Sequence, residues 1–251
     1  MVSLSEDLKK KERDVRAYIE EYAELFELDP NLIRALITQE SRFVANAVSP
    51  TGATGYGQFT GIGAKQVQNI AAMTPKAADL KNFTKQDADD ENIGIKAVCA
   101  TLWWLYYRKY PQVEDKKLRL EACLTFYNAG GKAAALVIQY GGHAQAVPAI
   151  KQLPSQYRSQ ADKYAPEVFL WFVAWHDFIE AEKKPVAKPT ETPPVLSNTN
   201  PFDNRTKNID VRYKALIEAL KLLADEDKDI DILTNTRDGL TELTLIFPGE
   251  I

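Results

Sequence analysis

The chain has 251 residues, with 31 basic and 35 acidic side chains and a formal net charge of −4. An apolar share of 45% is sufficient for a packed core, and the charged share of 26% excludes a disordered or collagen-like chain. The near balance of charge argues against a polyanion binder, so we expect no nucleic-acid partner. Two cysteines and two histidines, without metal-ligand spacing, predict neither a disulfide framework nor a metal site.

The opening residues, MVSLSEDLKKKERD, contain no apolar run that could form the core of a secretory signal, so we expect synthesis in the cytoplasm. The most apolar stretch, 168–175, is much shorter than the roughly 18 residues of a membrane span. We interpret it as a buried helix or strand and expect no integral membrane segment. An interfacial membrane role is the alternative, because aromatic belts look similar.

Helical patterns dominate the first 180 residues. Residues 3–26 carry apolar side chains at helical spacing, and Ser3 with Glu6 fits a reciprocal capping box. Asp29-Pro30 predicts the start of a second helix, because Asp caps free N–H groups and Pro has no N–H to leave unpaired. Further helices are expected at 93–110, 118–127 and 132–140. No convincing alternating strand precedes residue 200, so this region is predicted to be all-α.

The composition changes abruptly at residues 183–205, where five prolines accompany Thr, Ser and Asn. Such a segment predicts a semi-rigid linker between a domain at 1–182 and a small module at 206–251. Within that module, an amphipathic pattern at 211–224 predicts a helix. Asp238-Gly239 between two alternating runs predicts a β-hairpin, because glycine tolerates the positive φ of such turns.

The most informative stretch is ALITQESRFVANAVSPTGATGYGQFT, at residues 35–60. Glu40 lies at the end of an apolar helix turn. A loop comes directly after it, and the glycines of this loop allow the backbone to approach a ligand closely. Gln58 ends that loop with an amide, which offers a donor and an acceptor. Much later, Tyr127 and Asn128 place a phenol and an amide at the end of another predicted helix. One acid, two amides and an aromatic ring are components of a sugar-binding site.

These motifs resemble those of the soluble lytic transglycosylases, which have a goose-type lysozyme-like fold and cleave peptidoglycan. The family's Glu-Ser pair corresponds to Glu40-Ser41, and its Ser-Pro-x-Gly-Ala-x-Gly-Leu-Met-Gln stretch corresponds to residues 49–58. Its Tyr-Asn-Ala-Gly motif matches residues 127–130 outright. Motifs in the correct order are far more specific than any one alone. The resemblance implies a lysozyme-like α-helical catalytic domain. Together with the small α+β module predicted from the pattern at 206–251, this domain gives a fold class that is mainly α.

The resemblance also implies a mechanism with one catalytic carboxyl group and no cofactor. Glu40 is expected to protonate the glycosidic oxygen between N-acetylmuramic acid and N-acetylglucosamine. It then deprotonates the 6-hydroxyl, which closes a 1,6-anhydro ring, while the substrate's 2-acetamido group replaces a second carboxylate. Both roles require a raised pKa, for which Ile37, Phe43 and Phe126 are candidate apolar neighbours.

Residues that hold the glycan strand follow from the same resemblance. Gln58 and Asn128 are expected to bind acetamido and neighbouring groups, and Tyr127 to orient Glu40 or the sugar. Ser49 contacts the substrate or stabilises the loop. Tyr56 is expected at the floor of the site, which is altered because Tyr-Gly replaces the family's Leu-Met.

Some residues are interpreted as structural, and one family motif is missing. Ser41 is expected to be a helix-end residue, and His143 to lie in a solvated loop. The aromatic residues Trp103, Trp104, Tyr106 and Tyr107 are interpreted as core rather than a sugar platform, because adjacent helical residues point in different directions. The family's Glu-Thr-Arg segment has no clean match at 155–163, which leaves the groove shape there open.

Three function classes stay open from the sequence. The first is the lytic transglycosylase. The second is a peptidoglycan hydrolase (muramidase) on the same fold, in which Asp87, Asp89 or Asp90 supplies a second carboxylate. The third is a catalytically silent structural component of a virion or secretion channel.

Delivery and partners are predicted from charge and from the opening residues. Residues 206–251 contain six basic and ten acidic side chains, so the module is poorly suited to an anionic wall polymer. Docking onto a partner protein or self-association fits better. We expect a bacteriolytic enzyme that is carried in a phage virion or delivered by a secretion machine to the periplasm or cell wall.

Overall fold

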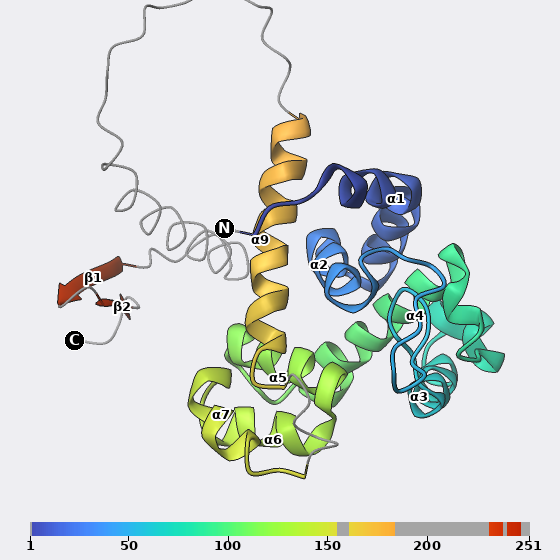
Figure 1. Ribbon diagram of the computed structural model, residues 1–251. Coiled ribbons are helices and arrows are strands. Elements are labelled where there is room, and N and C mark those ends of the chain that lie inside the picture. The colour runs from blue at the N-terminus through green and yellow to red at the C-terminus, as the bar shows by residue number, and fades with distance from the viewer. Residues whose placement is uncertain (1, 155–160, 184–230, 238–239, 247–251) are drawn as a thin grey trace, which may run out of the picture. The chain divides into compact units, whose positions relative to one another are not determined.

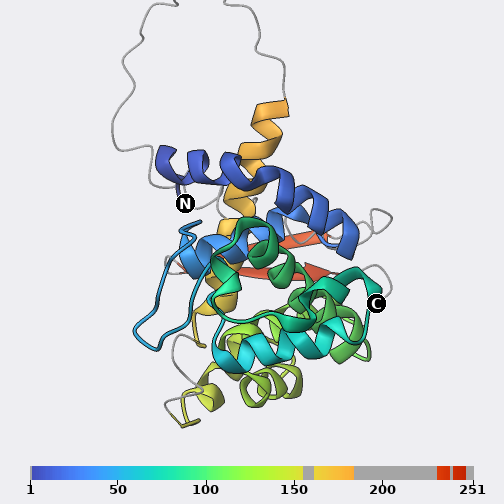
Figure 2. The ribbon, with the colours of Figure 1, turned by 90° about the vertical axis from the view of Figure 1, so that its right-hand side faces the viewer.

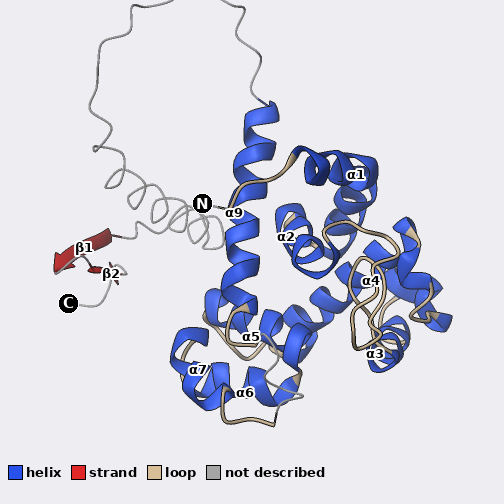
Figure 3. Cartoon of the chain, in the orientation of Figure 1, coloured by secondary structure: helices blue, strands red, loops and turns tan. Residues whose placement is uncertain are grey.

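The structure, a computed structural model, describes four stretches of the chain: residues 2–154, 161–183, 231–237 and 240–246. The chain divides into two units, Met1–Thr199 and Asn200–Ile251. The described part of the first unit is helical, and the described part of the second consists of strands (Figures 1 and 3). The prediction of a mainly α protein is confirmed.

The helices of the first unit are joined by short turns and one long loop at residues 42–60. In chain order they are α1 (Glu6–Phe26), α2 (Pro30–Ser41), α3 (Gly61–Ala71), the 3-10 turns η1 (Pro75–Asn82) and η2 (Asp87–Asp89), α4 (Glu91–Trp103), the π-helical turn η3 (Trp104–Lys109), α5 (Lys116–Ala129), α6 (Gly131–Gln139), α7 (His143–Ile150) and α9 (Tyr164–Lys183). None of these described helices is both long and apolar enough to cross a membrane.

Side-chain caps explain where the first two helices begin. Asp29 caps α2 as predicted, and its carboxylate accepts a hydrogen bond from the Asn31 N–H at 2.7 Å. The predicted cap of α1 at Ser3 is wrong. Ser5 directly precedes the first helical residue, and its Oγ accepts from the Leu8 N–H at 3.2 Å. Ser3 lies two residues before this cap, outside the helix.

Helix α2 is the most buried element beside the candidate site, with eight of its twelve residues in the interior. It packs against α1 and against α9, which runs past it in both views (Figures 1 and 2). Residues 168–175, predicted as a buried helix or strand, belong to α9. Trp175 of this helix is fully buried and packs edge-on against Phe43, with 5.7 Å between ring centroids.

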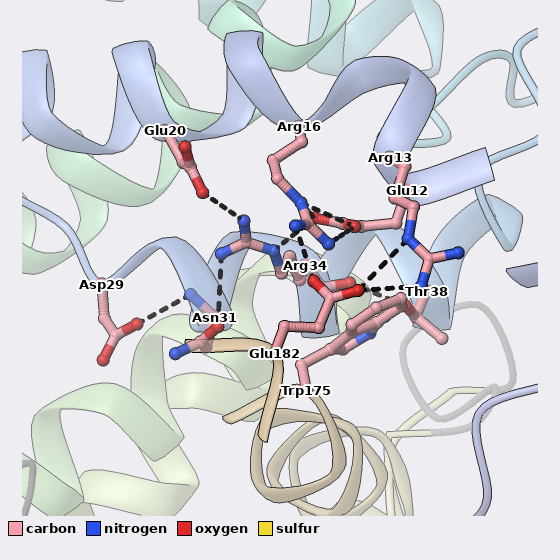
Figure 4. A network of polar contacts seen from close by, with 10 residues as sticks. All are labelled: Glu12, Arg13, Arg16, Glu20, Asp29, Asn31, Arg34, Thr38, Trp175 and Glu182. Atoms are coloured by element: carbon pink, nitrogen blue, oxygen red, sulfur yellow. Dashed lines mark hydrogen bonds and ion pairs between the residues drawn. The ribbon is translucent and has the colours of Figure 1, made fainter. Parts of the chain in front are cut away.

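A network of charged side chains joins α1, α2 and α9 (Figure 4). Glu12 of α1 is fully buried, and its carboxylate accepts from Arg16 at 2.6 Å and from Arg34 of α2 at 2.7 Å. At the rim, Glu182 of α9 binds Arg16 at 2.7 Å and Arg13 at 2.8 Å. A buried carboxylate is tolerated because it is paired and hydrogen-bonded. The network thus ties three helices together by directional contacts.

Two antiparallel strands are described in the second unit: β1 (Asp231–Arg237) and β2 (Leu240–Ile246). Their register pairs the first residue of β1 with the last of β2. The predicted turn at 238–239, the predicted helix at 211–224 and the linker from residue 184 onward lie outside the described residues. A helix-plus-hairpin module therefore remains a prediction.

Candidate active site

Glu40 lies in the last turn of the buried helix α2, where the chain changes direction sharply. Two successive non-glycine residues, Arg42 and Phe43, adopt positive φ angles of 50° and 57°. Such angles are costly for ordinary residues and are concentrated at functional sites. The hydroxyl of Ser41 lies 3.2 Å from the Ile37 carbonyl oxygen and 3.0 Å from that of residue 56. Ser41 thus joins the helix end to the loop, as predicted.

The glycines of the following loop permit close approach between backbone segments. Gly55 has a φ of 76°, and a Cβ there would lie 2.1 Å from the Ala88 carbonyl oxygen. A Cβ on Gly57 would lie 2.7 Å from the hydroxyl oxygen of Tyr127. That hydroxyl donates a hydrogen bond to the Gly57 carbonyl at 2.9 Å. The glycines thus bring the loop against the turn before α4 and against the end of α5.

Two tyrosines from different helices interact with Glu40, one by a hydrogen bond and one through the charge of its carboxylate. Tyr164, the first residue of α9, is 1% exposed and donates a hydrogen bond to Glu40 Oε1. Tyr127 of α5 is half-buried, and the removal of water around its phenol raises the pKa of that group, with a further contribution from the Glu40 charge. The structure thus brings Glu40 together with two phenols. Tyr164 donates a hydrogen bond to Glu40, and Tyr127 is held on the loop.

Burial raises the pKa of Glu40 to about 7, and the Tyr164 hydrogen bond opposes this rise because it stabilises the carboxylate. Among the described residues, no second carboxylate contributes to the pKa shift. A carboxyl with a pKa near neutrality can both give and take a proton, which is what an acid-then-base role requires. The predicted rise in the pKa is therefore present, and it comes from the surrounding protein.

The apolar residues expected around Glu40 differ in their placement. Ile37 and Phe43 are fully or almost fully buried. Phe126 is half-buried and packs edge-on against Trp104 and Tyr110, at centroid distances of 5.8 and 6.3 Å. Phe126 is therefore part of an aromatic cluster on α5 and the π-helical turn.

The loop itself uses the polar groups of two predicted binding residues. Gln58 Nε2 donates to the carbonyl oxygens of Ala47 at 3.0 Å and Gly55 at 3.1 Å. Ser49 Oγ accepts from the Ala53 N–H at 3.0 Å, in agreement with the loop-stabilising alternative. The amide nitrogen of Gln58 is thus engaged within the protein.

Tyr56 lies in the interior of the protein. Its side chain is 3% exposed, and burial raises its phenol pKa to about 12. The carboxylates that add to this rise are Glu91, Asp90 and Asp14, which belong to α1 and the start of α4. The ring is thus packed in the interior, facing α1 and α4. A contact between Tyr56 and the glycan stays a prediction, and the ring that replaces the family's Leu is buried here.

The end of α5 carries polar atoms that lack a partner. Asn128 Oδ1 and Thr125 Oγ1 are buried and have no hydrogen-bond partner among the described residues. A buried polar atom without a partner costs about 1–3 kcal/mol, so native proteins retain one where a ligand or water satisfies it. Thr125 and Asn128 are three residues apart on one helix. The sequence motif indicated Asn128 and missed Thr125.

A family model provides independent information on residues 17–148, which match the transglycosylase SLT domain. This match covers more than half of the chain. The chain belongs to the transglycosylase SLT domain family. The match includes Glu40, Gln58, Tyr127 and Asn128, and ends before α9.

Comparison with curated proteins gives no significant match. Two solved structures are similar to this chain at low sequence identity. An inactive mutant of the lytic transglycosylase Slt from Pseudomonas aeruginosa is 20% identical, with a TM-score of 0.46 over 66% of this chain and 24% of that one. The 70 kDa soluble lytic transglycosylase from Escherichia coli is 17% identical, with a TM-score of 0.48 over 65% of this chain and 24% of that one. This chain thus spans about a quarter of the length of either protein.

Sequence reasoning missed Tyr164, which lies outside the residues matched by the SLT domain model. It is 124 residues from Glu40 in the chain. No local pattern marks it, because its contact with Glu40 depends on the packing of α9 against α2. Residues 155–160, where the missing family motif was sought, lie outside the described part of the chain.

His143 also requires a correction. It is 3% exposed rather than solvated, and its Nε2 lies 2.7 Å from the Ala161 carbonyl oxygen. The backbone N–H of His143 donates to Glu121 Oε2 at 2.8 Å, which satisfies the first turn of α7. The preceding glycines allow α7 to begin directly, so the predicted loop is a helix start.

The aromatic run in the π-helical turn and the residue before it is only partly core. Trp103 and Trp104 are half-buried and pack against Phe26 and against the α5 cluster, respectively. Tyr107 is 38% exposed, and its hydroxyl donates to the Glu27 carbonyl at 2.9 Å. The core interpretation thus holds for the indole rings better than for Tyr107.

The aspartates of the hydrolase alternative have structural roles or are exposed. Asp90 caps α4 by accepting from two backbone N–H groups at 2.9 Å, and Asp87 accepts from Thr84. Asp89 is exposed. Within the described ranges, no cluster of three or more His, Cys, Asp or Glu side chains could hold a metal ion.

Proposed function

We propose that this protein is a peptidoglycan lytic transglycosylase, which cleaves the β-1,4 bond between N-acetylmuramic acid and N-acetylglucosamine with formation of a 1,6-anhydro ring. The observation that carries the proposal is Glu40: a carboxyl with a pKa near 7, in contact with a buried phenol, whose shift involves no second carboxylate among the described residues. Membership of the SLT domain family supports it.

In the first step, protonated Glu40 gives its proton to the glycosidic oxygen. The bond from that oxygen to C1 of the muramoyl sugar breaks, and its electron pair stays on the oxygen of the leaving N-acetylglucosamine. The 2-acetamido group of the substrate stabilises the positive charge that develops at C1. The Tyr164 hydrogen bond favours the carboxylate that Glu40 becomes, so it stabilises the state formed by the proton transfer.

In the second step, the Glu40 carboxylate takes the proton of the muramoyl 6-hydroxyl. The 6-oxygen forms a bond to C1 and closes the anhydro ring, which restores protonated Glu40 and consumes no water. A pKa close to the working pH makes both proton transfers accessible to one group. Hydrolysis would instead require a base that activates water. Of the aspartates proposed for that role, Asp90 caps a helix, Asp87 binds Thr84 and Asp89 lies exposed.

Substrate positioning in this proposal falls to the loop and the end of α5. The unpartnered Asn128 Oδ1 can accept the N–H of an acetamido group, which would satisfy a buried acceptor. Tyr127 holds the loop through Gly57, and Gln58 offers its amide oxygen. Glycan strands of peptidoglycan are the implied partner.

The mass of the products tests the reaction directly. Purified peptidoglycan sacculi are digested with the full-length chain, and the soluble muropeptides are analysed by mass spectrometry. We expect anhydro ends. Reducing ends, heavier by the mass of one water, would contradict the proposal in favour of a muramidase. Binding of sacculi without soluble products would favour a silent structural component.

We further propose that residues 206–251 dock a partner protein and bring the enzyme to the wall within a phage particle or secretion machine. The support is their acidic composition, which suits a protein surface better than an anionic polymer. Replacing Asp225, Glu226 and Asp227 by Ser should abolish incorporation into such particles and leave sacculus digestion unchanged. Normal incorporation, or a loss confined to wall binding, would contradict this.

A further inference from the structure

The end of α2 is joined to α9 by side-chain hydrogen bonds from three consecutive residues. Thr38 Oγ1 accepts from the indole N–H of Trp175 at 2.8 Å, and Glu40 accepts from Tyr164 (Figure 4 shows the Thr38 pair). Gln39 lies between them and completes the set. The partners on α9 recur at helical spacing and share one face: Tyr164, Glu167, Trp171 and Trp175.

Gln39 uses both ends of its amide. Its Nε2 donates to Glu167 Oε2 at 2.8 Å, and its Oε1 accepts from the Trp171 indole N–H at 3.0 Å. The two partners are of opposite kind, since one is an acceptor and the other a donor. If the amide rotated by half a turn, its oxygen would face the Glu167 carboxylate and its NH2 would face the Trp171 N–H, so both hydrogen bonds would be lost. The pair of bonds therefore specifies one orientation of Gln39 and one register of α9.

We propose that Gln39 is a positioning residue, which locks α2 and α9 in the register that places the Tyr164 phenol on Glu40. We call Gln39, Glu167 and Trp171 the latch. A slide of α9 by one residue, about 1.5 Å, would separate Gln39 from both partners. The same slide would carry the phenol away from the carboxyl, and a misplacement of about 1 Å at a reacting group can cost about 100-fold in rate.

In the described part of the chain, the latch is the tie between α2 and α9 that lies nearest to the Tyr164 bond, since the Thr38 bond to Trp175 is 11 residues beyond Tyr164. Helix α9 is outside the residues that the SLT domain model matches. Its tie to α1 through Glu182 is 18 residues beyond Tyr164, about 27 Å along the helix. A tie at that distance stabilises the packing but leaves the Tyr164 end to be set locally. The latch residues Glu167 and Trp171 lie one and two turns from Tyr164.

The surroundings of the latch allow it to be tested by substitution. Gln39, Glu167 and Trp171 border a cavity of about 320 Å³. Because Gln39 is half-buried at a cavity rather than enclosed in the core, Gln39→Leu removes both hydrogen bonds with little change in packing. Trp171→Phe keeps a ring and removes the single N–H donor.

The experiment measures how Tyr164 responds to Glu40, using NMR of the full-length chain with tyrosine labelled at the phenolic ring carbon. In the wild type, the Tyr164 signal should move as Glu40 ionises, with a midpoint near pH 7. The Glu40 charge also acts on Tyr127, which lies on α5 outside the latch, so Tyr127 serves as an internal reference. Tyr164→Phe and Tyr127→Phe assign the two signals.

Gln39→Leu should reduce the pH-dependent shift of the Tyr164 signal by at least half and should leave the shift of the Tyr127 signal unchanged. Trp171→Phe should reduce the Tyr164 shift less, because the Gln39 bond to Glu167 remains. Glu167→Gln should retain the shift, because the new amide oxygen can still accept from Gln39. Glu182→Gln is the matched control: it removes ion pairs of α9 and lowers the Tm, yet it should preserve the Tyr164 response. An unchanged Tyr164 response in Gln39→Leu, or an equal loss in Glu182→Gln, would overturn the proposal.

The catalytic consequence rests on the proposed function and is measured separately. With sacculi as substrate, Gln39→Leu should lower kcat by about tenfold or more at an unchanged KM, since ground-state binding does not involve the latch. If the wild type releases no products, the proposed function fails, and the NMR titration still decides whether the latch positions Tyr164.

Discussion

Glu40→Gln is expected to lower kcat for the release of anhydro-muropeptides about 1,000-fold, because the substitution removes the only proton donor of the proposed mechanism. Glutamine has nearly the shape of the carboxyl and can still accept the Tyr164 hydrogen bond, so the fold should persist. The raised pKa means that ionised Glu40 is disfavoured in the folded state. The variant should therefore have a higher Tm than the wild type above pH 7, where the wild type carries that charge.

Product release from sacculi, followed by mass spectrometry, checks the loss of activity, and Asp89→Asn is its matched control. Asp89 is an exposed carboxylate of the hydrolase alternative, and its replacement should leave the rate unchanged. The wild-type rate should fall as the pH rises above about 7, since the first step requires the protonated form of Glu40. Full activity in Glu40→Gln, or loss of activity in Asp89→Asn, would contradict the assignment.

Arg34→Met is expected to lower the free energy of unfolding by about 3 kcal/mol, the cost of breaking a buried ion pair from one side. Arg34 is 1% exposed and binds the fully buried Glu12 at 2.7 Å and Glu20 at 2.9 Å (Figure 4). Without it, Arg16 is the cationic partner that Glu12 keeps among the described residues. Urea unfolding at pH 7 measures the difference, provided that the slope with denaturant stays the same.

The double variant Glu12→Leu with Arg34→Met should recover much of that loss, because it removes both buried charges together. Lys76→Met is the control: its pair with Glu27, at 2.7 Å, lies near the surface and should contribute less than about 1 kcal/mol. A double variant as unstable as the sum of the single variants would show that Glu12 and Arg34 act independently.

Local sequence was sufficient to predict the start of α2, the glycine-rich loop and the residues of the three motifs. Capping at Asp29 and positive φ at Gly55 depend on neighbouring residues, so a short segment of sequence determines them. The same is true of the all-α character of the first unit, which follows from helical spacing. The position of Asn128 after Tyr127 is also local, since both are in one motif.

Long-range packing decided the properties that the proposed chemistry requires. The pKa of Glu40 depends on which side chains exclude water around it, and its partner Tyr164 comes from a helix 124 residues away. His143 was predicted to be solvated and is buried, because a sequence pattern shows the period of an element and not which neighbour covers it. Residue types and caps can be read from the sequence, whereas desolvation and interhelical register arise only when distant segments pack together.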